Sequence, residues 1–548
     1  MTSVRTRSAR IPLPISLPWL LLLVAAYLLP GLAGHDPWKT DDAISFGIVL
    51  EALHGNWLVP NLAGEPYAPA SPLYFWIAAV FAKLFSGVLP LHDGARFASG
   101  FCTAFAIGCT ALAARELYGA VAASTAALIL IGCVGLLLHA HAMTAEIALF
   151  AALAATLYGL ALASRRPLAA GIIAGCGIGA AFLAHGVAPA ASSLLLAAIV
   201  SLGRSESRRH AAHFWAGLVP ASLPWIAIWP AALFLTDTRQ FAEWWAALNV
   251  GQLPVADNSQ PFAQALGYLK LLGWYAWPSL PLALWTLWFY RLRLSHPGIV
   301  LPVCAFVVFL AMLSCGKDAR DITALPLLLP LTLLGAASAG ELRRGAANAL
   351  DWFGMMTFSL LAVAVWAGYL AMITGVPADF AAFFTAQEPG FSARFDAAAM
   401  AVALVFSATW VALVTGTERS PYRGVTHWAA GMTLAWALLA TLWLPWIDYG
   451  KSYRAMSASL QPHISKDGCV SSRNLGEPQR ASLHYFSGLV TQRAEFRDKV
   501  RGTDCPMMLV QGSVKDDSGN PGTGWELVWQ GNRPGDRSER YRFYRRLD

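Results

Sequence analysis

Two adjacent acids, Asp41 and Asp42, are the first residues of this chain whose type and position favour catalysis. They follow the polar segment His35–Thr40. A carboxylate in such a position can take a proton from an attacking hydroxyl group. The same acids, with Thr40, can instead cap a helix that begins near Ala43, because their side chains satisfy free backbone N–H groups. Both roles are compatible, since a capping carboxylate is held in a fixed orientation.

A third acid, Glu146, stands at the start of an apolar run and follows His139 and His141. Ionisable groups at membrane depth are usually functional or paired, so Glu146 is a candidate catalytic residue. The alternative is an exposed glutamate at the start of a helix. The two histidines are candidate substrate contacts or ordinary interfacial residues. Without a third ligand nearby they give an incomplete metal set, so no cofactor is firmly predicted, although a divalent metal stays open.

A cluster of cations, Lys317 and Arg320, lies between two apolar runs. Such side chains can bind a phosphate group. The alternative is internal pairing with the neighbouring acids Asp318 and Asp321. His185, between two further runs, is a weaker candidate of the same kind, and an interfacial role is the simpler interpretation.

The elements that position these residues are membrane helices. Of the 548 residues, 56% are hydrophobic and only 13% are charged, against about 25% charged in soluble domains. Runs of about 20 apolar residues recur, each long enough to cross a membrane. An α-helical polytopic membrane protein with about 13 transmembrane helices is therefore predicted. The expected spans are 14–33, 97–115, 120–138, 145–163, 167–184, 187–202, 212–233, 266–289, 298–314, 322–338, 352–374, 396–416 and 426–446.

The positive charges predict the orientation of these spans. The net charge of +7 is spread over short loops, which favours membrane topology over nucleic-acid binding. The basic loops fall on one side only if the apolar run 72–88 is left out of the count. That run is therefore predicted to lie in the outer membrane face, with Lys83 reaching the interface. The loop 34–96 and everything after residue 446 are then outside the cytoplasm, and the N-terminus is inside.

The segment 447–548 has a different character and predicts a small soluble α/β domain. Residues 479–487 are typical of a helix, whereas 507–511, 525–529 and 541–544 are typical of strands. No long linker precedes this segment, so it is expected to pack on the membrane domain 1–446. Cys469 and Cys505 are either a disulfide or two free thiols. Within the bundle, glycines at 171, 175 and 179 predict close helix packing.

Three segments together resemble the first outer loop of GT-C glycosyltransferases. They are Thr40–Ala43, Gly55–Tyr67 and Ser71–Trp76, in this order. The similarity is greatest to bacterial aminoarabinose transferases that modify lipid A and to protein O-mannosyltransferases. Two later segments, Leu223–Trp225 and Ser314–Pro330, resemble further parts of that superfamily. The resemblance spans most of residues 35–340.

This resemblance implies an inverting transfer of a sugar from a polyprenyl phosphate, such as undecaprenyl phosphate, in the bacterial inner membrane. The acceptor would be lipid A, another glycolipid or a protein on the periplasmic side. Asp41 would be the general base or would position the acceptor, with Asp42 and Glu146 as further catalytic acids. The remaining candidates divide by role: Lys317, Arg320 and His185 would hold the donor phosphate, and Tyr67, Tyr74, His139 and His141 would line the substrate loop.

The chain also departs from the aminoarabinose transferases. It has Pro69–Pro72 where they carry Glu-Lys-Pro-Pro, and His185 where they carry a lysine. The segment 235–265 contains no histidine, which disfavours a metal site there. A different sugar or acceptor explains these changes most simply. A flippase for lipid-linked glycans and an inactive membrane scaffold are the alternative functions, the former disfavoured because the acids lie mainly at span ends.

Overall fold

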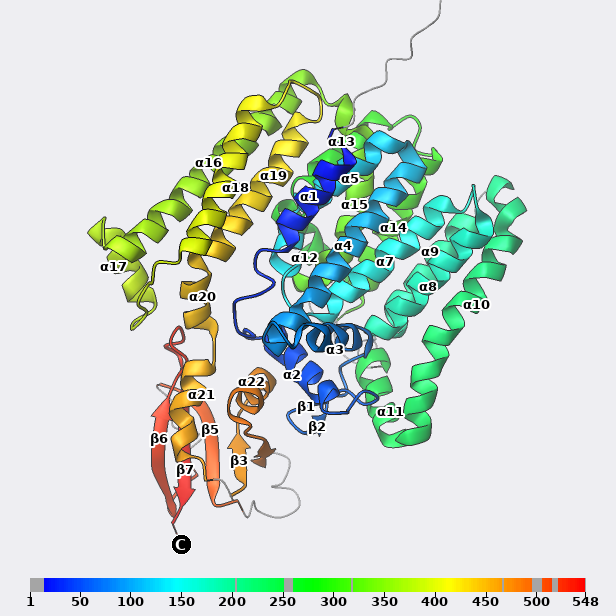
Figure 1. Cartoon of the computed structure of the whole chain (residues 1–548). Helices are drawn as coiled ribbons and strands as arrows, with labels where there is room; N and C mark the ends of the chain where they lie inside the picture. Colours follow the sequence, from blue (N-terminus) through cyan, green and yellow to red (C-terminus); the bar gives the residue numbers. More distant parts are fainter. Residues whose placement is uncertain are drawn as a thin grey trace, which may run out of the picture.

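The computed structural model describes residues 14–202, 205–250, 260–316, 319–465, 468–494, 505–514 and 521–547. Most of them form helices that lie side by side in one bundle, with a small sheet domain beyond one end of it (Figure 1). Eight helices of this described part are long and apolar enough to cross a membrane, and further apolar helices are shorter. The multi-span helical fold with a small C-terminal sheet domain is thus as predicted.

Every predicted span overlaps a helix or a pair of helices, while the number of membrane crossings stays a prediction. These helices are α1 (Leu17–Leu28), α4 (Leu91–Tyr118), α5 (Ala120–Ile131) with α6 (Val134–His139), α7 (Ala145–Leu162), α8 (Pro167–His185), α9 (Val187–Leu202), α10 (Ser205–Thr236), α12 (Pro261–Tyr275) with α13 (Ser279–Phe289), α14 (Pro297–Ser314), α15 (Leu325–Ser338), α16 (Arg344–Thr374), α18 (Ala397–Gly416) and α19 (Arg423–Leu438).

Two of the predicted spans are wrong as single helices. The range 266–289 breaks between α12 and α13, where Pro278 has no N–H to donate and its ring crowds the preceding turn. The range 120–138 breaks between α5 and α6. There the Trp428 indole N–H donates to the Gly132 carbonyl at 2.9 Å, which replaces a bond inside the helix. Hydropathy does not register such breaks, because the flanking residues are apolar on both sides.

The predicted close approach at the glycines of α8 is confirmed. A Cβ atom on Gly171 would collide with the backbone carbonyl oxygen of Phe214 in α10, and one on Gly175 would collide with that of Leu218. Backbone atoms inside a helix cannot move aside as a flexible side chain can. The α8–α10 contact therefore depends on the absence of side chains at these positions.

Replacing Gly171 by alanine is expected to lower the stability of the bundle, by about 1–3 kcal/mol as for other overpacked sites. The measurement is thermal denaturation of the purified chain in one detergent. Gly108→Ala in α4 is the matched control, since a Cβ there meets nothing within 4 Å. Equal melting of the two variants would contradict the packing argument.

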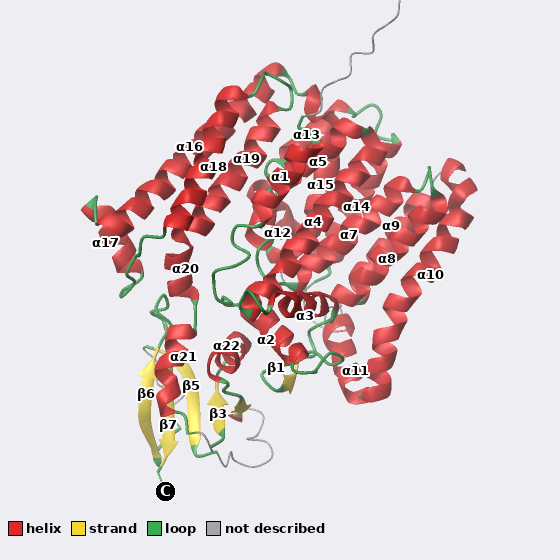
Figure 2. Ribbon diagram, in the orientation of Figure 1, coloured by secondary structure: helices red, strands yellow, loops and turns green. Residues whose placement is uncertain are grey.

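The loop 34–96, here named the outer loop after its predicted side of the membrane, folds into two helices and a hairpin. These are α2 (Asp41–Leu53), the pair β1 (Asn61–Leu62) and β2 (Glu65–Pro66), and α3 (Leu73–Phe85). Figure 2 shows α2 and α3 across the end of the bundle, between it and the sheet domain. The 13 residues of α3 give a length of about 20 Å, which is less than the about 30 Å of a membrane core. α1 and α5, with 12 residues each, are equally short, so the position of α3 in the outer membrane face stays a prediction.

The C-terminal domain is built on a five-stranded mixed sheet of order β4-β3-β5-β7-β6. The predicted strands are confirmed as β5 (Met507–Ser513), β6 (Trp525–Gly531) and β7 (Glu539–Arg546), and the predicted helix as α22 (Glu477–Ser487). The strands β3 (Val470–Arg473) and β4 (Thr491–Arg493) were not predicted, because they are short and mostly polar. Cys469 and Cys505 form a disulfide just before β3 and β5.

The domain packs directly on the outer loop, as expected from the lack of a linker. α22 lies against α2, where a Cβ on Gly47 would come within 2.8 Å of the Ala481 Cβ. The buried Arg480 of α22 donates to Glu65 Oε2 at 2.9 Å. The chain reaches the domain through α20 (Leu444–Lys451) and α21 (Arg454–Leu460), which follow α19. The outer loop is thus held between the bundle and the sheet domain.

Candidate functional site

A carboxylate and a guanidinium group from distant parts of the chain meet at the outer loop. Asp41 is the first residue of α2, and Arg320 follows α14. Arg320 Nη2 donates to Asp41 Oδ2 at 3.1 Å, across a separation of 279 residues. The side chains are 40% and 54% exposed, so a substrate can reach both. The structure thus brings together the predicted base and one predicted phosphate ligand.

The environment of Asp41 makes its carboxylate more basic than usual. Burial raises the pKa of Asp41, and the nearby Glu146 carboxylate raises it further, while Arg320 has the opposite effect. The net direction is upward. A carboxylate with a raised pKa is a better proton acceptor in catalysis.

Asp42 has a different role from its neighbour. Its Oδ1 accepts from the Met143 N–H at 2.7 Å, and its Oδ2 accepts from the Trp38 N–H at 3.0 Å and from Arg96 at 3.2 Å. With these three donors, Asp42 ties the start of α2 to the bundle. The predicted catalytic role of Asp42 is therefore disfavoured. The capping interpretation holds only in part, because Thr40 makes no side-chain cap bond while both acids lie in the first turn.

Glu146 and His139 lie close to the Asp41–Arg320 pair. Thr144 caps α7, and its hydroxyl donates to the Glu146 carboxylate. His139 Nε2 is 3.7 Å from Asp321 Oδ2, beside Arg320. Both residues therefore border the pair, as the sequence suggested.

Three predicted substrate-loop residues remain, and they differ in their surroundings: Tyr67, Tyr74 and His141. Burial raises the pKa of Tyr67, and the carboxylates of Glu477 and Asp41 raise it further. Tyr74 is fully buried and bonds Ser99 Oγ at 2.7 Å. His141 is buried, bonds the Tyr27 carbonyl and stacks on Trp436. These contacts give Tyr74 and His141 structural partners, and their substrate-loop role stays a prediction without geometric support.

Two phosphate-ligand predictions receive no geometric support. His185 ends α8 next to Gly186, and no contact joins it to Asp41 or Arg320. Lys317 and its neighbour Asp318 lie outside the described residues.

Sequence reasoning missed Arg96, which is completely buried beside the site. Its guanidinium bonds Asp93 Oδ1 at 2.9 Å and Asp42 Oδ2 at 3.2 Å, and it also donates to the His35 carbonyl at 3.3 Å. Arg96 thereby joins α4 to the loop that precedes α2. The sequence signal that could have identified Arg96 is its position at the very edge of an apolar run.

A second missed group connects the outer loop to the chain after α19. Asp448 Oδ1 in α20 accepts from the Asp36 N–H at 2.9 Å and from the Trp38 indole at 2.8 Å. Arg454 in α21 donates to both carboxylate oxygens of Asp36, at 2.9 and 2.5 Å. Burial raises the pKa of Asp448 to about 6. Nothing in the local sequence pairs these residues, because more than 400 positions separate them.

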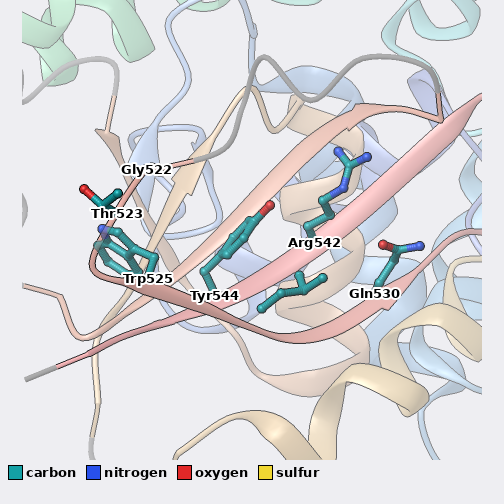
Figure 3. A pocket seen from close by; sticks show the side chains of 7 residues that line it. Gly522, Thr523, Trp525, Gln530, Arg542 and Tyr544 are labelled. Atoms are coloured by element: carbon teal, nitrogen blue, oxygen red, sulfur yellow. The ribbon is translucent and has the colours of Figure 1, made fainter.

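The part of the chain that the structure describes contains no group of three or more His, Cys, Asp or Glu placed to hold a metal ion. A cavity of about 720 Å³ lies on the C-terminal sheet instead. Figure 3 shows its lining side chains along β6 and β7, among them Trp525, Arg542 and Tyr544. No predicted site residue lines this cavity, so the candidate site rests on the contacts of Asp41.

Comparison with known proteins gives one consistent result. Residues 68–244 match the family described as dolichyl-phosphate-mannose-protein mannosyltransferase. Two undecaprenyl phosphate-alpha-4-amino-4-deoxy-L-arabinose arabinosyl transferases, from Pseudomonas aeruginosa and Pseudomonas paraeruginosa, are each 27% identical over 77% of this chain and 75% of their own length.

Among solved structures, ArnT from Cupriavidus metallidurans superposes with a TM-score of 0.68 in the apo state, at 17% identity. The match covers 96% of this chain and 98% of that one. The same protein bound to undecaprenyl phosphate superposes with a TM-score of 0.67. The whole chain, sheet domain included, therefore shares that fold.

Proposed function

We propose that the chain is a glycosyltransferase of the superfamily that contains the aminoarabinose transferases and protein O-mannosyltransferases, and that it takes its sugar from a polyprenyl-phosphate donor. The curated relatives are named for undecaprenyl-phosphate donors, and the Cupriavidus protein has been solved with undecaprenyl phosphate. A donor with a long lipid tail matches a site at the end of a bundle of apolar helices.

The observation that carries this proposal is the contact between Asp41 and Arg320 at 3.1 Å. A general base and a cation for a leaving phosphate are the two groups that such a transfer requires. The phosphate of the donor would compete for Arg320, so donor binding would release Asp41 to act as a base.

The proposed reaction is a single displacement at the anomeric carbon. Asp41 accepts the proton of the acceptor hydroxyl, and the acceptor oxygen forms the new bond to that carbon. The bond from the anomeric carbon to the phosphate oxygen breaks, and its electron pair leaves with polyprenyl phosphate. Attack opposite the leaving group inverts the anomeric centre. Arg320 and, as predicted from the sequence, Lys317 and His185 would stabilise the phosphate, while Glu146 keeps Asp41 basic.

The proposal includes the membrane arrangement expected from the charges. About 13 helices of residues 1–446 would span the bacterial inner membrane, with the N-terminus inside. The loop 34–96 and the domain 447–548 would lie on the periplasmic side, where the relevant acids gather. The disulfide between Cys469 and Cys505 suits an oxidising compartment.

The acceptor in this proposal is a hydroxyl or phosphate-bearing lipid such as lipid A, with another glycolipid or a protein as alternatives. Ala70 stands where aminoarabinose transferases carry a lysine, and it is buried beside Tyr67, Trp229 and Trp244 in an apolar niche. The absence of that cation supports a sugar or acceptor different from theirs.

A transfer assay tests the proposal. The purified full chain would be given a panel of undecaprenyl-phosphate sugars with lipid and protein acceptors, and the glycosylated acceptor would be detected by mass spectrometry. Transfer with one donor supports an enzyme and identifies the sugar. Translocation of labelled lipid without transfer would instead support a flippase. Neither activity, in a folded chain, would support a scaffold.

Replacing Arg320 by methionine is expected to raise the KM for the donor and to lower kcat. The variant loses the guanidinium that would hold the phosphate in both the ground state and the transition state, at a cost of roughly 1.5–3 kcal/mol for a hydrogen bond to a charged group. Initial rates over a range of donor concentrations measure both constants. Arg239→Met is the matched control, because Arg239 is an exposed arginine that forms an ion pair with nearby Glu243 and none with the Asp41 region in the described part of the chain. Equal kinetics in the two variants would remove Arg320 from the site.

A further inference from the structure

The segment that carries Asp41 is attached to the C-terminal sheet by an ion pair. Lys39, two residues before Asp41, pairs with Glu539 at the start of β7. Glu539 is itself fixed, because the Tyr541 hydroxyl donates to its other oxygen at 2.7 Å. Tyr541 is fully buried in the sheet domain. The carboxylate is thus oriented by its own domain as well as by Lys39.

A second anchor lies at the start of the same segment. Arg454 and Ser452 both donate to the Asp36 carboxylate, the serine at 2.6 Å. Two-point guanidinium contacts of this kind fix geometry as well as charge. Lys39–Glu539 and Asp36–Arg454 are together named the C-terminal clamp.

The opposite side of the segment is attached to the bundle. Asp42 accepts from the Met143 N–H at 2.7 Å and from the buried Arg96. Asp41 therefore lies between a fixed residue on each side, with Lys39 held by the sheet domain and Asp42 by the bundle. The Asp41 side chain itself faces Arg320 and can contact a substrate.

From this arrangement we propose that the C-terminal domain completes the catalytic centre, with Glu539, acting through Lys39, as a positioning residue for Asp41. The inference rests on the proposed function and adds a residue to it. The clamp sets the place of the base relative to Arg320. The sheet domain is thereby part of the machinery for transfer and more than a cover over the outer loop.

The test compares Glu539→Gln, Lys39→Gln and the double variant, all as full chains. A misplaced base lowers turnover without weakening donor binding, so kcat is expected to fall roughly 10- to 100-fold with an unchanged KM for the donor. The double variant should lose no more than either single one, since both remove one interaction. Lys39→Arg should restore most of the turnover. Glu526→Gln, an exposed acid on neighbouring β6, is the matched control.

Amide hydrogen exchange of residues 38–46 gives a readout apart from activity, and it should quicken in Glu539→Gln but not in the control. Full turnover in Glu539→Gln and Lys39→Gln, with wild type active and Asp41→Asn inactive, would overturn this inference alone. A fall in kcat accompanied by equal loss of folded protein in both variants would also overturn it. A wild-type chain that transfers no sugar would overturn the proposed function and this inference with it.

Discussion

Asp41→Asn is expected to lower kcat by about 10²–10⁴-fold, the usual contribution of a general base. Asparagine has the shape of aspartate but cannot accept the acceptor proton. The KM for the donor should not rise, because Arg320 is released from its pairing with Asp41 and is free for the phosphate. Transfer of labelled sugar from the donor identified in the panel measures both constants.

The pH dependence of the wild type follows from the raised pKa of Asp41. The base must be deprotonated, so kcat/KM should fall as the pH drops through a value above about 3.9, the ordinary pKa of aspartate. Asp41→Asn should lack this acidic limb. The native state also holds this proton more tightly than the unfolded chain. The charged carboxylate therefore lowers stability as the pH rises through the same window, and the variant should be at least as stable as wild type at neutral pH.

Asp379→Asn in α17 (Ala378–Gln387) is the control for this experiment, since it removes an exposed acid from another helix. It should retain wild-type turnover. If Asp41→Asn kept more than a tenth of the wild-type kcat, another acid would have to be the base, and Glu146 is the nearest candidate. Loss of turnover with loss of folded protein would contradict the stability argument above.

Arg96→Met is expected to have the largest effect on stability, about 3–5 kcal/mol, as when one partner of a buried ion pair is removed. The variant leaves the carboxylates of Asp42 and Asp93 buried without their shared cation. It also removes a donor to the His35 carbonyl in the outer loop. Thermal inactivation and chemical denaturation in one detergent measure the loss.

The control for this prediction is Arg394→Met, which removes an exposed arginine and should leave stability nearly unchanged. Addition of Asp93→Asn to Arg96→Met should recover part of the loss, because one of the two unpaired charges is gone. A melting temperature of Arg96→Met equal to that of the control would show that the buried network does not hold the outer loop in place.

Hydropathy and charge were sufficient to predict the membrane bundle, because each apolar run leads to one helix or a broken pair. Periodicity also located β5, β6 and β7, whose residues are apolar or aromatic. It missed β3 and β4, which are short and polar and which depend on their neighbours in the sheet. The breaks at Pro278 and Gly132 depend on tertiary partners that local patterns do not contain.

The site was predictable in its residue types and only partly in its geometry. Asp41 and Arg320 were both candidates, but their contact joins positions 279 apart and has no local signature. Asp41 and Asp42 look equivalent in the sequence. Their contacts diverge because the first turn of α2 points one toward Arg320 and the other toward Met143 and Arg96. The sequence also gave no sign that Tyr74 and His141 are buried, because aromatic residues at an interface and in a core follow the same pattern.

The pairing of Lys39 with Glu539 also determines when, during synthesis of the chain, the segment with Asp41 becomes anchored. The two residues are 500 positions apart, so at common rates of synthesis a ribosome needs roughly 25 to 100 s to travel from one to the other. During that interval the segment with Asp41 has left the ribosome without its anchor in β7. If this pair positions Asp41 as proposed, a nascent chain would bind donor lipid before it reached full turnover, and full turnover would begin only after the sheet domain had folded.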